Sequence, residues 1–265
     1  MRKKKHIRNV ILLAAAAAVI SLSGCLDVET EVLVKKDGSG RVKQTFLMKK
    51  EFVDMIGAMQ GQENYTLLNK DELREKPGAM GKGVTFLEAT PLERAGFSGY
   101  TVLYRFTNIE ELRLNQNPGE AVPDEASGED STEEIVRFSF EDGRTNKLKI
   151  LMPETQFEKE DRGETSIPKD EQQEFIEAFH ELYKDMKIAM YVTVDGKITA
   201  TNATYRNGNT ITLMEINFAE IADNPEKIKE LARFDPDTME ELKAFIADIP
   251  AMKGELQEEV EISFR

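Results

Sequence analysis

The sequence of 265 residues contains one cysteine, Cys25, no tryptophan, and two histidines, His6 and His180. A lone thiol has no partner for a disulfide within the chain. So few thiols and imidazoles also exclude the Cys and His clusters that bind structural zinc, and they leave little for Cys–His or Ser–His–Asp catalysis. We therefore expect a protein that is not an enzyme and that uses no cofactor.

Long hydrophobic runs are also scarce, and the longest lies at the start of the chain. It extends from Val10 to Leu22 and is interrupted only by Ser21. Thirteen residues are too short to span a bilayer as a helix, because a helix rises about 1.5 Å per residue and the hydrocarbon core is about 30 Å thick. The run follows a cluster of cations: Arg2, Lys3, Lys4, Lys5 and Arg8. This order predicts a signal peptide over residues 1–24.

The predicted signal peptide ends in Leu22-Ser23-Gly24-Cys25, which resembles the lipobox of bacterial lipoproteins. The resemblance implies that a diacylglyceryl group alkylates the thiol of Cys25, that the chain is cleaved before it, and that fatty acid such as palmitate follows on the new amino terminus. Cys25 is thus the predicted lipid attachment site. The alternative is an ordinary secretory signal followed by an unrelated cysteine. Leu26, where inner-membrane lipoproteins often have Asp, favours the outer membrane in a cell with two membranes.

Charge limits the partners of the mature chain. Cleavage before Cys25 removes five of the 35 Lys and Arg residues and none of the 49 Asp and Glu residues, leaving 30 against 49 and a net charge of about −19. Nucleic-acid binding needs clustered cations, and so does electrostatic binding to anionic lipid. We therefore expect no nucleic-acid partner, and we expect attachment to the membrane through acyl chains on Cys25.

Apolar side chains alternate with polar ones over residues 28–48, which predicts two strands of a β-hairpin. Val42, Phe46 and Met48 share one face of the second strand. The turn is Asp37-Gly38-Ser39-Gly40, in which glycine supplies positive φ and the Asp37 carboxylate can cap the backbone. A calcium or phosphate loop is the alternative, although the oxygen ligands or the following helix that it requires are absent.

The rest of the chain predicts an α+β domain over residues 25–265, built as a curved, mostly antiparallel sheet of hairpins with amphipathic helices packed on one face. Further strands are expected at residues 84–92, 97–106, 135–140, 147–152, 187–194, 197–205, 210–218 and 256–264. The three strands of residues 187–218 are expected to form an antiparallel meander. Helices are expected at residues 50–60, 70–76, 109–112 and 169–186, and after Asn224-Pro225 and Asp235-Pro236.

Residues 115–134 differ in composition from the rest of the chain. They contain seven acids, no cation, two prolines and two glycines. Such a segment cannot bury enough apolar surface to fold, so it is predicted to be a disordered acidic insertion. A solvated excursion from a strand edge is the favoured interpretation, and an arm that binds a partner is the alternative.

No catalytic residue is assigned. His180 flanks the apolar face of a predicted helix, so it is interpreted as a packing or rim residue. The carboxylate pairs Asp170 with Glu171 and Asp235 with Asp237 could supply an acid and a base. Both pairs lie at predicted helix starts, where acidic side chains stabilise the helix dipole, and that role is preferred.

Several motifs resemble those of LppM-like bacterial lipoproteins. They are the lipobox followed by a strand, Asp37-Gly38-Ser39-Gly40 and a second strand; the segment from Gly99 to Leu112; and Gly196-Lys197-Ile198 to Asn202 followed by Asn207-Gly208-Asn209-Thr210. The resemblance implies a cell-envelope domain of mixed α and β structure that binds a lipid or glycolipid. The acidic insertion and the lack of a carboxyl-terminal transmembrane segment depart from that pattern.

Two functions are consistent with the sequence. The first is a lipid-anchored envelope module that binds an apolar or lipid-like ligand, with the ten methionines of the mature chain lining an adaptable site. For Met55, Met59, Met186 and Met239, a place in a helix-to-sheet core is preferred over a ligand site. The second function is an assembly subunit whose acidic surface recruits an envelope protein partner.

Replacing the lipidation residue tests the predicted anchor. Cys25→Ala removes the thiol, so we expect the chain to lose palmitate labelling and to leave the membrane fraction. Ser23→Ala keeps a small residue before the cleavage site and should be labelled and retained. A Cys25→Ala chain that still sediments with membranes would contradict the prediction.

Overall fold

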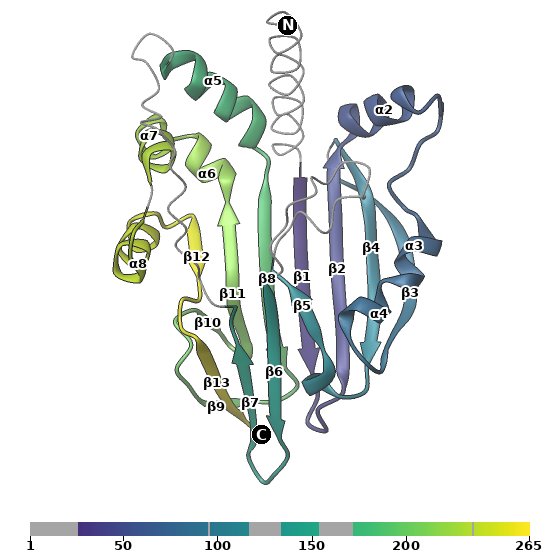
Figure 1. Ribbon diagram of the computed structural model, residues 1–265, viewed down its shortest axis with the longest axis vertical. Helices are drawn as coiled ribbons and strands as arrows, with labels where there is room; N and C mark the ends of the chain where they lie inside the picture. Colours follow the sequence, from purple (N-terminus) through teal and green to yellow (C-terminus); the bar gives the residue numbers. More distant parts are fainter. Residues whose placement is uncertain (1–25, 95, 117–133, 154–171, 235) are drawn as a thin grey trace, which may run out of the picture.

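The computed structural model describes residues 26–94, 96–116, 134–153, 172–234 and 236–265 (Figure 1). Its strands are β1 (Leu26–Val34), β2 (Gly40–Lys49), β3 (Val84–Arg94), β4 (Phe97–Phe106), β5 (Arg113–Asn115), β6 (Ile135–Glu141), β7 (Asn146–Leu151), β8 (Lys187–Val194), β9 (Ile198–Thr201), β10 (Arg206–Asn207), β11 (Thr210–Asn217), β12 (Met252–Gly254) and β13 (Glu259–Phe264). Its helices are α2 (Lys50–Met59), α3 (Lys70–Glu75), α4 (Pro77–Met80), the 3₁₀ helix η2 (Ile109–Glu111), α5 (Gln172–Tyr183), α6 (Phe218–Ala222), α7 (Pro225–Arg233) and α8 (Met239–Asp248).

The strands form two sheets. The large sheet has the order β10-β11-β8-β1-β2-β4-β3, with β12 also paired to β11, and the small sheet has the order β5-β6-β7-β13-β9. All neighbouring strands are antiparallel except β1 and β8, which are parallel. The prediction of a mostly antiparallel α+β fold is therefore confirmed, whereas the prediction of a single sheet was wrong.

The predicted meander of residues 187–218 was also wrong in its middle strand. β8 pairs with β11, but β9 between them leaves the large sheet and pairs with β13. The chain changes sheets at Gly196, where a Cβ would lie 2.4 Å from the carbonyl oxygen of Arg265. The alternation of apolar residues predicted three strands in these places, although the middle one, expected at residues 197–205, covers only Ile198–Thr201. Alternation does not specify which strand each one pairs with.

The first hairpin forms as predicted. β1 and β2 pair from Leu26 with Met48 to Val34 with Gly40. The carboxylate of Asp37 accepts hydrogen bonds from the backbone N–H and the hydroxyl of Ser39, at 3.0 and 2.7 Å, and Gly38 has a φ of 75°. These bonds lower the pKa of Asp37. Asp37 therefore caps the turn.

The hairpin turn marks one end of the large sheet, which we call the tip end; the opposite end, where β1 begins, is the Leu26 end. The small sheet lies at the tip end (Figure 1). A Cβ on Gly38 would lie 2.9 Å from the ring of Phe140, and the side-chain amide of Asn146 donates a 2.9 Å hydrogen bond to the carbonyl of Lys36. One hydrophobic cluster joins the two sheets there.

A buried carboxylate holds the β12–β13 connection in place. Glu255 is only 4% exposed, and its oxygens accept bonds from the N–H of Thr204 at 2.7 Å and from the hydroxyl of Thr204 at 3.0 Å. The third donor is the side-chain amide of Gln257, at 3.2 Å. Three donors offset the cost of removing the charge from water.

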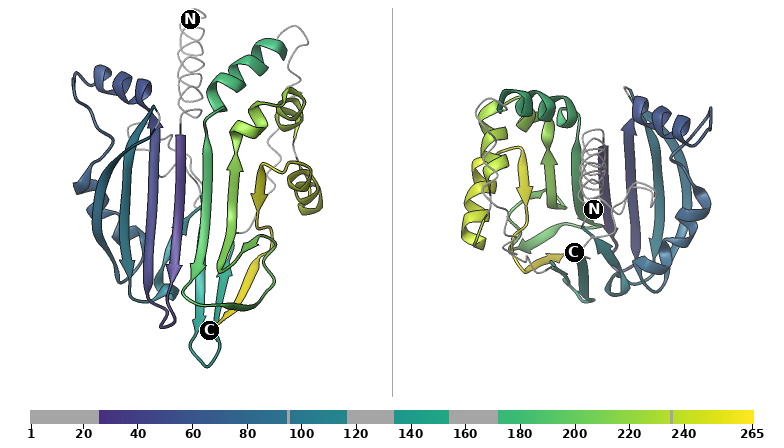
Figure 2. Two further views of the ribbon diagram at one scale, coloured as in Figure 1. Left: turned by 180° about the vertical axis from the view of Figure 1, so that it is seen from behind. Right: turned by 45° about the horizontal axis from the view of Figure 1, so that its top comes forward.

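The helices stand in two groups on opposite flanks of the large sheet (Figure 2). α2, α3 and α4 contact strands β2 to β5, whereas α5, α6 and α7 contact one another and α8 contacts β12. Asn69, Asn108 and Asn224 cap α3, η2 and α7 through their side-chain oxygens, as helix starts require.

The start of α8 differs from the sequence prediction. The helix begins at Met239 instead of directly after Asp235-Pro236, and Thr238 caps it by accepting from the N–H of Glu241. Glu241 in turn accepts from the N–H of Asp237 at 2.8 Å. These side-chain oxygens accept hydrogen bonds from backbone N–H groups that have no partner inside the helix, as helix starts require. The helix therefore begins at Met239, beyond the proline.

Gly99 gives a test of the packing of the large sheet. A Cβ at Gly99 would lie 2.0 Å from the carbonyl oxygen of Phe46 on the neighbouring strand. Gly99→Ala must displace that backbone, so we expect the free energy of unfolding in urea to fall by about 1–3 kcal/mol. Gly78→Ala is the matched control, because no atom lies within 4 Å of its Cβ position, and it should cause no loss. Equal effects of the two substitutions would refute the packing argument.

Candidate functional site

The candidate site is built from a row of apolar side chains across the large sheet. Strand register places them side by side on the face turned toward the small sheet, here called the inner face. From one flank to the other, the row is Met252, Ile216, Ile188, Val28, Phe46 and Tyr100. Six neighbouring strands, β12, β11, β8, β1, β2 and β4, thus each contribute one apolar residue.

The next row toward the tip end carries two polar groups. Its members are Met214, Met190, Thr30, Gln44 and Val102. Thr30 is buried and Gln44 is half-buried, and neither makes a side-chain hydrogen bond within the described part of the chain. Apolar surface with a few polar groups is the usual composition of small-molecule sites.

Burial of the inner face decreases toward the Leu26 end on β11 and β12, whereas Phe46 and Met48 on β2 stay only 2% and 1% exposed. Near the tip, Val34, Val42, Val192 and Ile211 are all 0% exposed. In the row toward the Leu26 end, Val28 is 7% exposed and Ile188 is 6% exposed, and Ile216 and Met252 are half-buried; Met214, in the next row, is half-buried as well.

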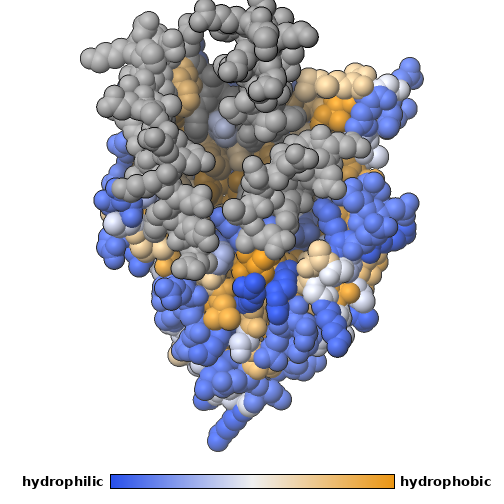
Figure 3. Space-filling model, viewed as in Figure 1, coloured by the Kyte–Doolittle hydropathy of each residue, from blue (hydrophilic) through white to orange (hydrophobic). Residues whose placement is uncertain are grey.

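Strand length explains this gradient. At about 3.3 Å per residue, the ten residues of β2 extend about 33 Å, whereas the six or seven residues of β6, β7 and β13 extend only about 20 Å. The small sheet starts at the tip end, so it stops short of the Leu26 end. Figure 3 shows hydrophobic surface set back between the two flanks in that region. We call the two rows described above the Leu26-end apolar face.

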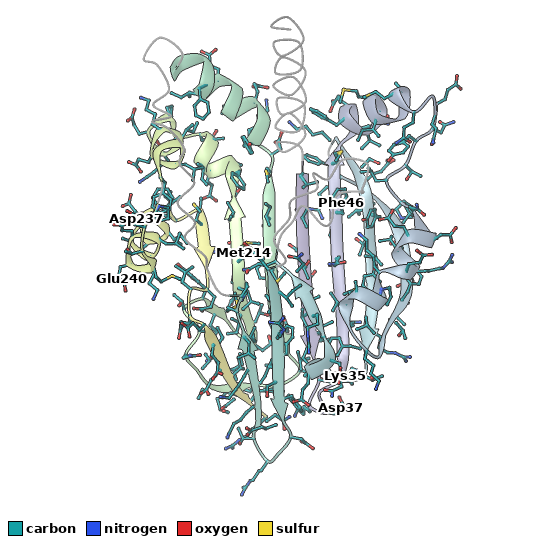
Figure 4. All side chains as sticks on the ribbon, viewed as in Figure 1. Lys35, Asp37, Phe46, Met214, Asp237 and Glu240 are labelled. Atoms are coloured by element: carbon teal, nitrogen blue, oxygen red, sulfur yellow. The ribbon has the colours of Figure 1, made fainter. Side chains whose placement is uncertain are left out.

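Two aromatic rings form one side of this face. Phe46 and Tyr100 stack with their centroids 5.6 Å apart and an interplanar angle of 25°. Burial raises the pKa of Tyr100, so its hydroxyl is neutral at physiological pH. In Figure 4, Phe46 on β2 and Met214 on β11 lie on either side of β1 and β8. The face thus has rigid rings on one side and a flexible thioether on the other.

The methionines lie in other places than the sequence analysis expected. Met48, Met190, Met214 and Met252 are on the inner face. Of the four proposed as core residues, Met186 is buried and Met239 is half-buried. Met55 and Met59 are 44% and 82% exposed, so that prediction was wrong for both. Helical spacing placed Met55 and Met59 on the apolar side of the helix. Only tertiary packing decides how much of that side is buried against the rest of the domain.

The opposite, outer face of the same strands carries several ion pairs. Lys43 pairs with Glu31 at 2.5 Å, Lys187 with Glu29 at 3.7 Å, and Lys253 with Glu215 at 2.5 Å. Glu215 also accepts a 2.5 Å hydrogen bond from the hydroxyl of Tyr191. These exposed and half-exposed pairs each contribute little to stability, but together they make this part of the outer face a solvated surface.

The other residues considered in the sequence analysis form no further site within the part of the chain that the structure describes. Cys25, the signal peptide, Asp170, Glu171 and Asp235 lie outside the described residues. His180 is at the rim, half-exposed, with its Nε2 atom 3.6 Å from a carboxylate oxygen of Asp223. Among the described residues, no group of three or more His, Cys, Asp or Glu side chains could hold a metal ion.

The acidic insertion is described only at its ends. Asn115, expected within it, instead belongs to β5, and the N–H of Gln116 donates a 2.8 Å hydrogen bond to the carbonyl of Glu134. The segment therefore connects the adjacent strands β5 and β6, and residues 117–133 lie outside the described part. No helix within the described ranges is long and apolar enough to cross a membrane.

The fold and site thus define a two-sheet α+β domain whose large sheet has an apolar inner face and an outer face with charged pairs. No protein-family model and no curated protein matches the chain. Among solved structures, the chain is similar to the folded domain of LppM from Mycobacterium tuberculosis, determined by NMR, at 9% sequence identity and a TM-score of 0.35. The likeness covers 92% of this chain and 91% of that chain, and it transfers no residue role.

The pKa of Glu29 gives a pH-dependent prediction. Burial, and then the neighbouring Glu31, raise this pKa above its ordinary value of 4.5. A raised carboxyl pKa means that ionisation costs stability, so the penalty is absent below about pH 4 and appears as pH rises through the raised pKa. Glu29→Gln removes it. Because solvent screens this half-buried group, we expect the variant to gain at most about 1 kcal/mol over the parent at pH 7, and nothing at about pH 3.5.

Urea unfolding at the two pH values measures the effect of Glu29→Gln. The matched control is Glu88→Gln, because Glu88 is an exposed acid on β3 of the same sheet. A gain at the acidic pH as large as that at neutral pH would show that the ionised carboxylate is not the cause.

Proposed function

We propose that this chain is a lipid-anchored lipoprotein of the cell envelope, held by acyl chains on Cys25, whose domain binds an apolar or lipid-like ligand without catalysis. In a cell with two membranes, the residue after Cys25 favours the outer membrane. The ligand lies against the Leu26-end apolar face. The observation that carries the proposal is that the apolar inner face of the large sheet extends beyond the length of the small sheet.

The composition of the face supports a ligand with long apolar groups. Six strands contribute one apolar residue each to a single row. Adjacent strands are about 4.8 Å apart, so the row extends for about 24 Å, which is long enough for an acyl chain. Methionine side chains adapt to ligands of irregular shape, and Met190, Met214 and Met252 lie in the two rows.

The polar residues of the face support a ligand with a polar group at one position. The hydroxyl of Thr30 and the amide of Gln44 lie opposite each other on β1 and β2 in the second row. The hydroxyl and the amide can both donate and accept hydrogen bonds, so they suit an ester, an amide or a sugar hydroxyl. The pairing of an apolar row with these two groups favours a lipid over a plain hydrocarbon.

Lipid extraction tests the proposal directly. The mature chain purified from its membrane should carry a bound lipid that is not covalently attached, detected by native mass spectrometry and identified after extraction. A Cys25→Ser chain, purified without the anchor, should bind the neutral probe N-phenyl-1-naphthylamine with increased fluorescence. Purified protein without lipid that also fails to bind the probe would refute the proposal.

Substitutions on the two faces of β11 locate the site. Met214 lies on the inner face opposite Met190, whereas Thr212 lies on the outer face opposite Tyr191, and both side chains are half-buried. Met214→Lys places a charge on the apolar face, so we expect the affinity for the probe to fall about tenfold or more, equivalent to about 1.4 kcal/mol. Thr212→Lys adds the same charge to the same strand and should bind the probe as the parent does.

Thermal unfolding of both lysine variants controls for loss of the fold. Similar unfolding temperatures with different probe affinities would support the site. Equal probe affinities of the Met214→Lys and Thr212→Lys variants would place the probe elsewhere on the molecule.

A further inference from the structure

Three helices lie at the end of the large sheet where the described chain begins. Leu26 of β1 pairs with Met48 of β2, and α2 begins two residues after Met48. On the other side of β1, Asp27 pairs with Lys187 of β8, which follows α5, and the N–H of Phe218, the first residue of α6, donates to the carbonyl of Met186. The start of β1 therefore lies between α2 on one flank and α5 and α6 on the other (Figure 2).

The apolar side chains of helix α2 occupy a wider arc of the helix than the part that is buried against the rest of the domain. Val53 and Gly57 are buried against the rest of the domain, and Phe52 and Ile56 pack partly on the core. At about 100° per residue, the apolar arc continues past Phe52 to Met55 and Met59. These two side chains are 44% and 82% exposed.

Among the described residues, the exposed side chains of α2 form the most extensive exposed group of large hydrophobic residues. The large hydrophobic side chains that are exposed in the described part of the chain are Met55, Met59, Leu87 and Leu151. Only Met55 and Met59 are one turn apart on a single helix, and Figure 3 shows hydrophobic surface over this flank. The other two are isolated on β3 and β7.

Helix α2 carries three charged side chains: Lys50, Asp54 and Glu51, the last exposed in the first turn, one turn before Met55. Lys50 and Asp54 pair with each other at 2.8 Å along α2, and Lys49 pairs with Asp185 at 2.6 Å. The mature chain as a whole has a net charge of about −19, so electrostatics would repel it from an anionic surface. A contact between this end of the domain and a bilayer must therefore be apolar.

We propose that the Met55 and Met59 face of α2 inserts at the boundary between headgroups and acyl chains of the bilayer that holds the anchor. The inference rests on the proposed lipid on Cys25. Adjacent Cα atoms are about 3.8 Å apart, so an anchor at Cys25 holds Leu26 at the membrane surface. The first turn of α2 lies within about 10 Å of Leu26, given the spacing of adjacent strands and the rise per residue.

This orientation has a consequence for the ligand. The Leu26-end apolar face meets the bilayer at the same end of the sheet as α2. A lipid-like ligand can then pass between the bilayer and the sheet without crossing water. The long axis of the strands stands away from the membrane, and the small sheet is the part of the domain farthest from it (Figure 1).

Site-directed fluorescence on the lipidated chain tests the orientation. Lipid occupies the thiol of Cys25, so Met59→Cys supplies a single free thiol for an environment-sensitive dye. Leu87→Cys is the matched control, because Leu87 is 48% exposed on β3, away from the Leu26 end. Each labelled protein is reconstituted into phosphatidylcholine vesicles that contain a lipid with a nitroxide quencher on its acyl chain.

We expect the dye at position 59 to shift its emission to shorter wavelength on reconstitution, to be quenched by the nitroxide lipid, and to lose quenching by aqueous iodide. The dye at position 87 should show none of these changes. Flotation of the same vesicles reports the anchor separately. Protein that floats but shows equal quenching at the two positions overturns the orientation alone, whereas protein that does not float overturns both the anchor and the orientation.

Discussion

The structure depends on the pairing of β1 with a strand on each side. Backbone hydrogen bonds join β1 to β2 in antiparallel register and to β8 in parallel register, although about 150 residues separate β1 from β8 in the chain. This pairing aligns the alternating side chains of three strands, so that the valines of β1 lie on the inner face and Glu29 and Glu31 on the outer face. A slip of one residue in either pair would turn Val28 and Val32 outward.

An amphipathic sheet needs a cover for its apolar face, and the small sheet is shorter than the face that it covers. Its strands pack at the tip end, where Phe140 lies against the turn at Gly38 and the core is fully buried. The remainder of the apolar face, with the stacked rings of Phe46 and Tyr100, extends toward the Leu26 end. A single mismatch in strand length thus separates the part of the sheet that the small sheet covers from the part that we propose as the ligand site.

The proposed anchor, ligand face and bilayer contact share one end of the molecule. Each is inferred from a different observation: the lipobox in the sequence, the register of the apolar rows, and the exposed arc of α2. Their proximity follows from the topology, because β1 is both the first strand of the described chain and a central strand of the large sheet. The proposed tether on Cys25 would therefore hold the middle of the large sheet, and not its flank, next to the membrane.

The sequence by itself determined most of the elements and some of their caps, because alternation, helical spacing and side chains such as Asp37 and Asn224 act over a few residues. It also determined the first hairpin, whose turn is local. Only the tertiary structure decided that β9 joins a second sheet, that β8 lies parallel to β1, and that Met55 and Met59 stay exposed while Met190 faces inward. Those outcomes depend on hydrogen bonds and packing between residues far apart in the chain, and a local pattern shows that a side chain is apolar without showing what will cover it.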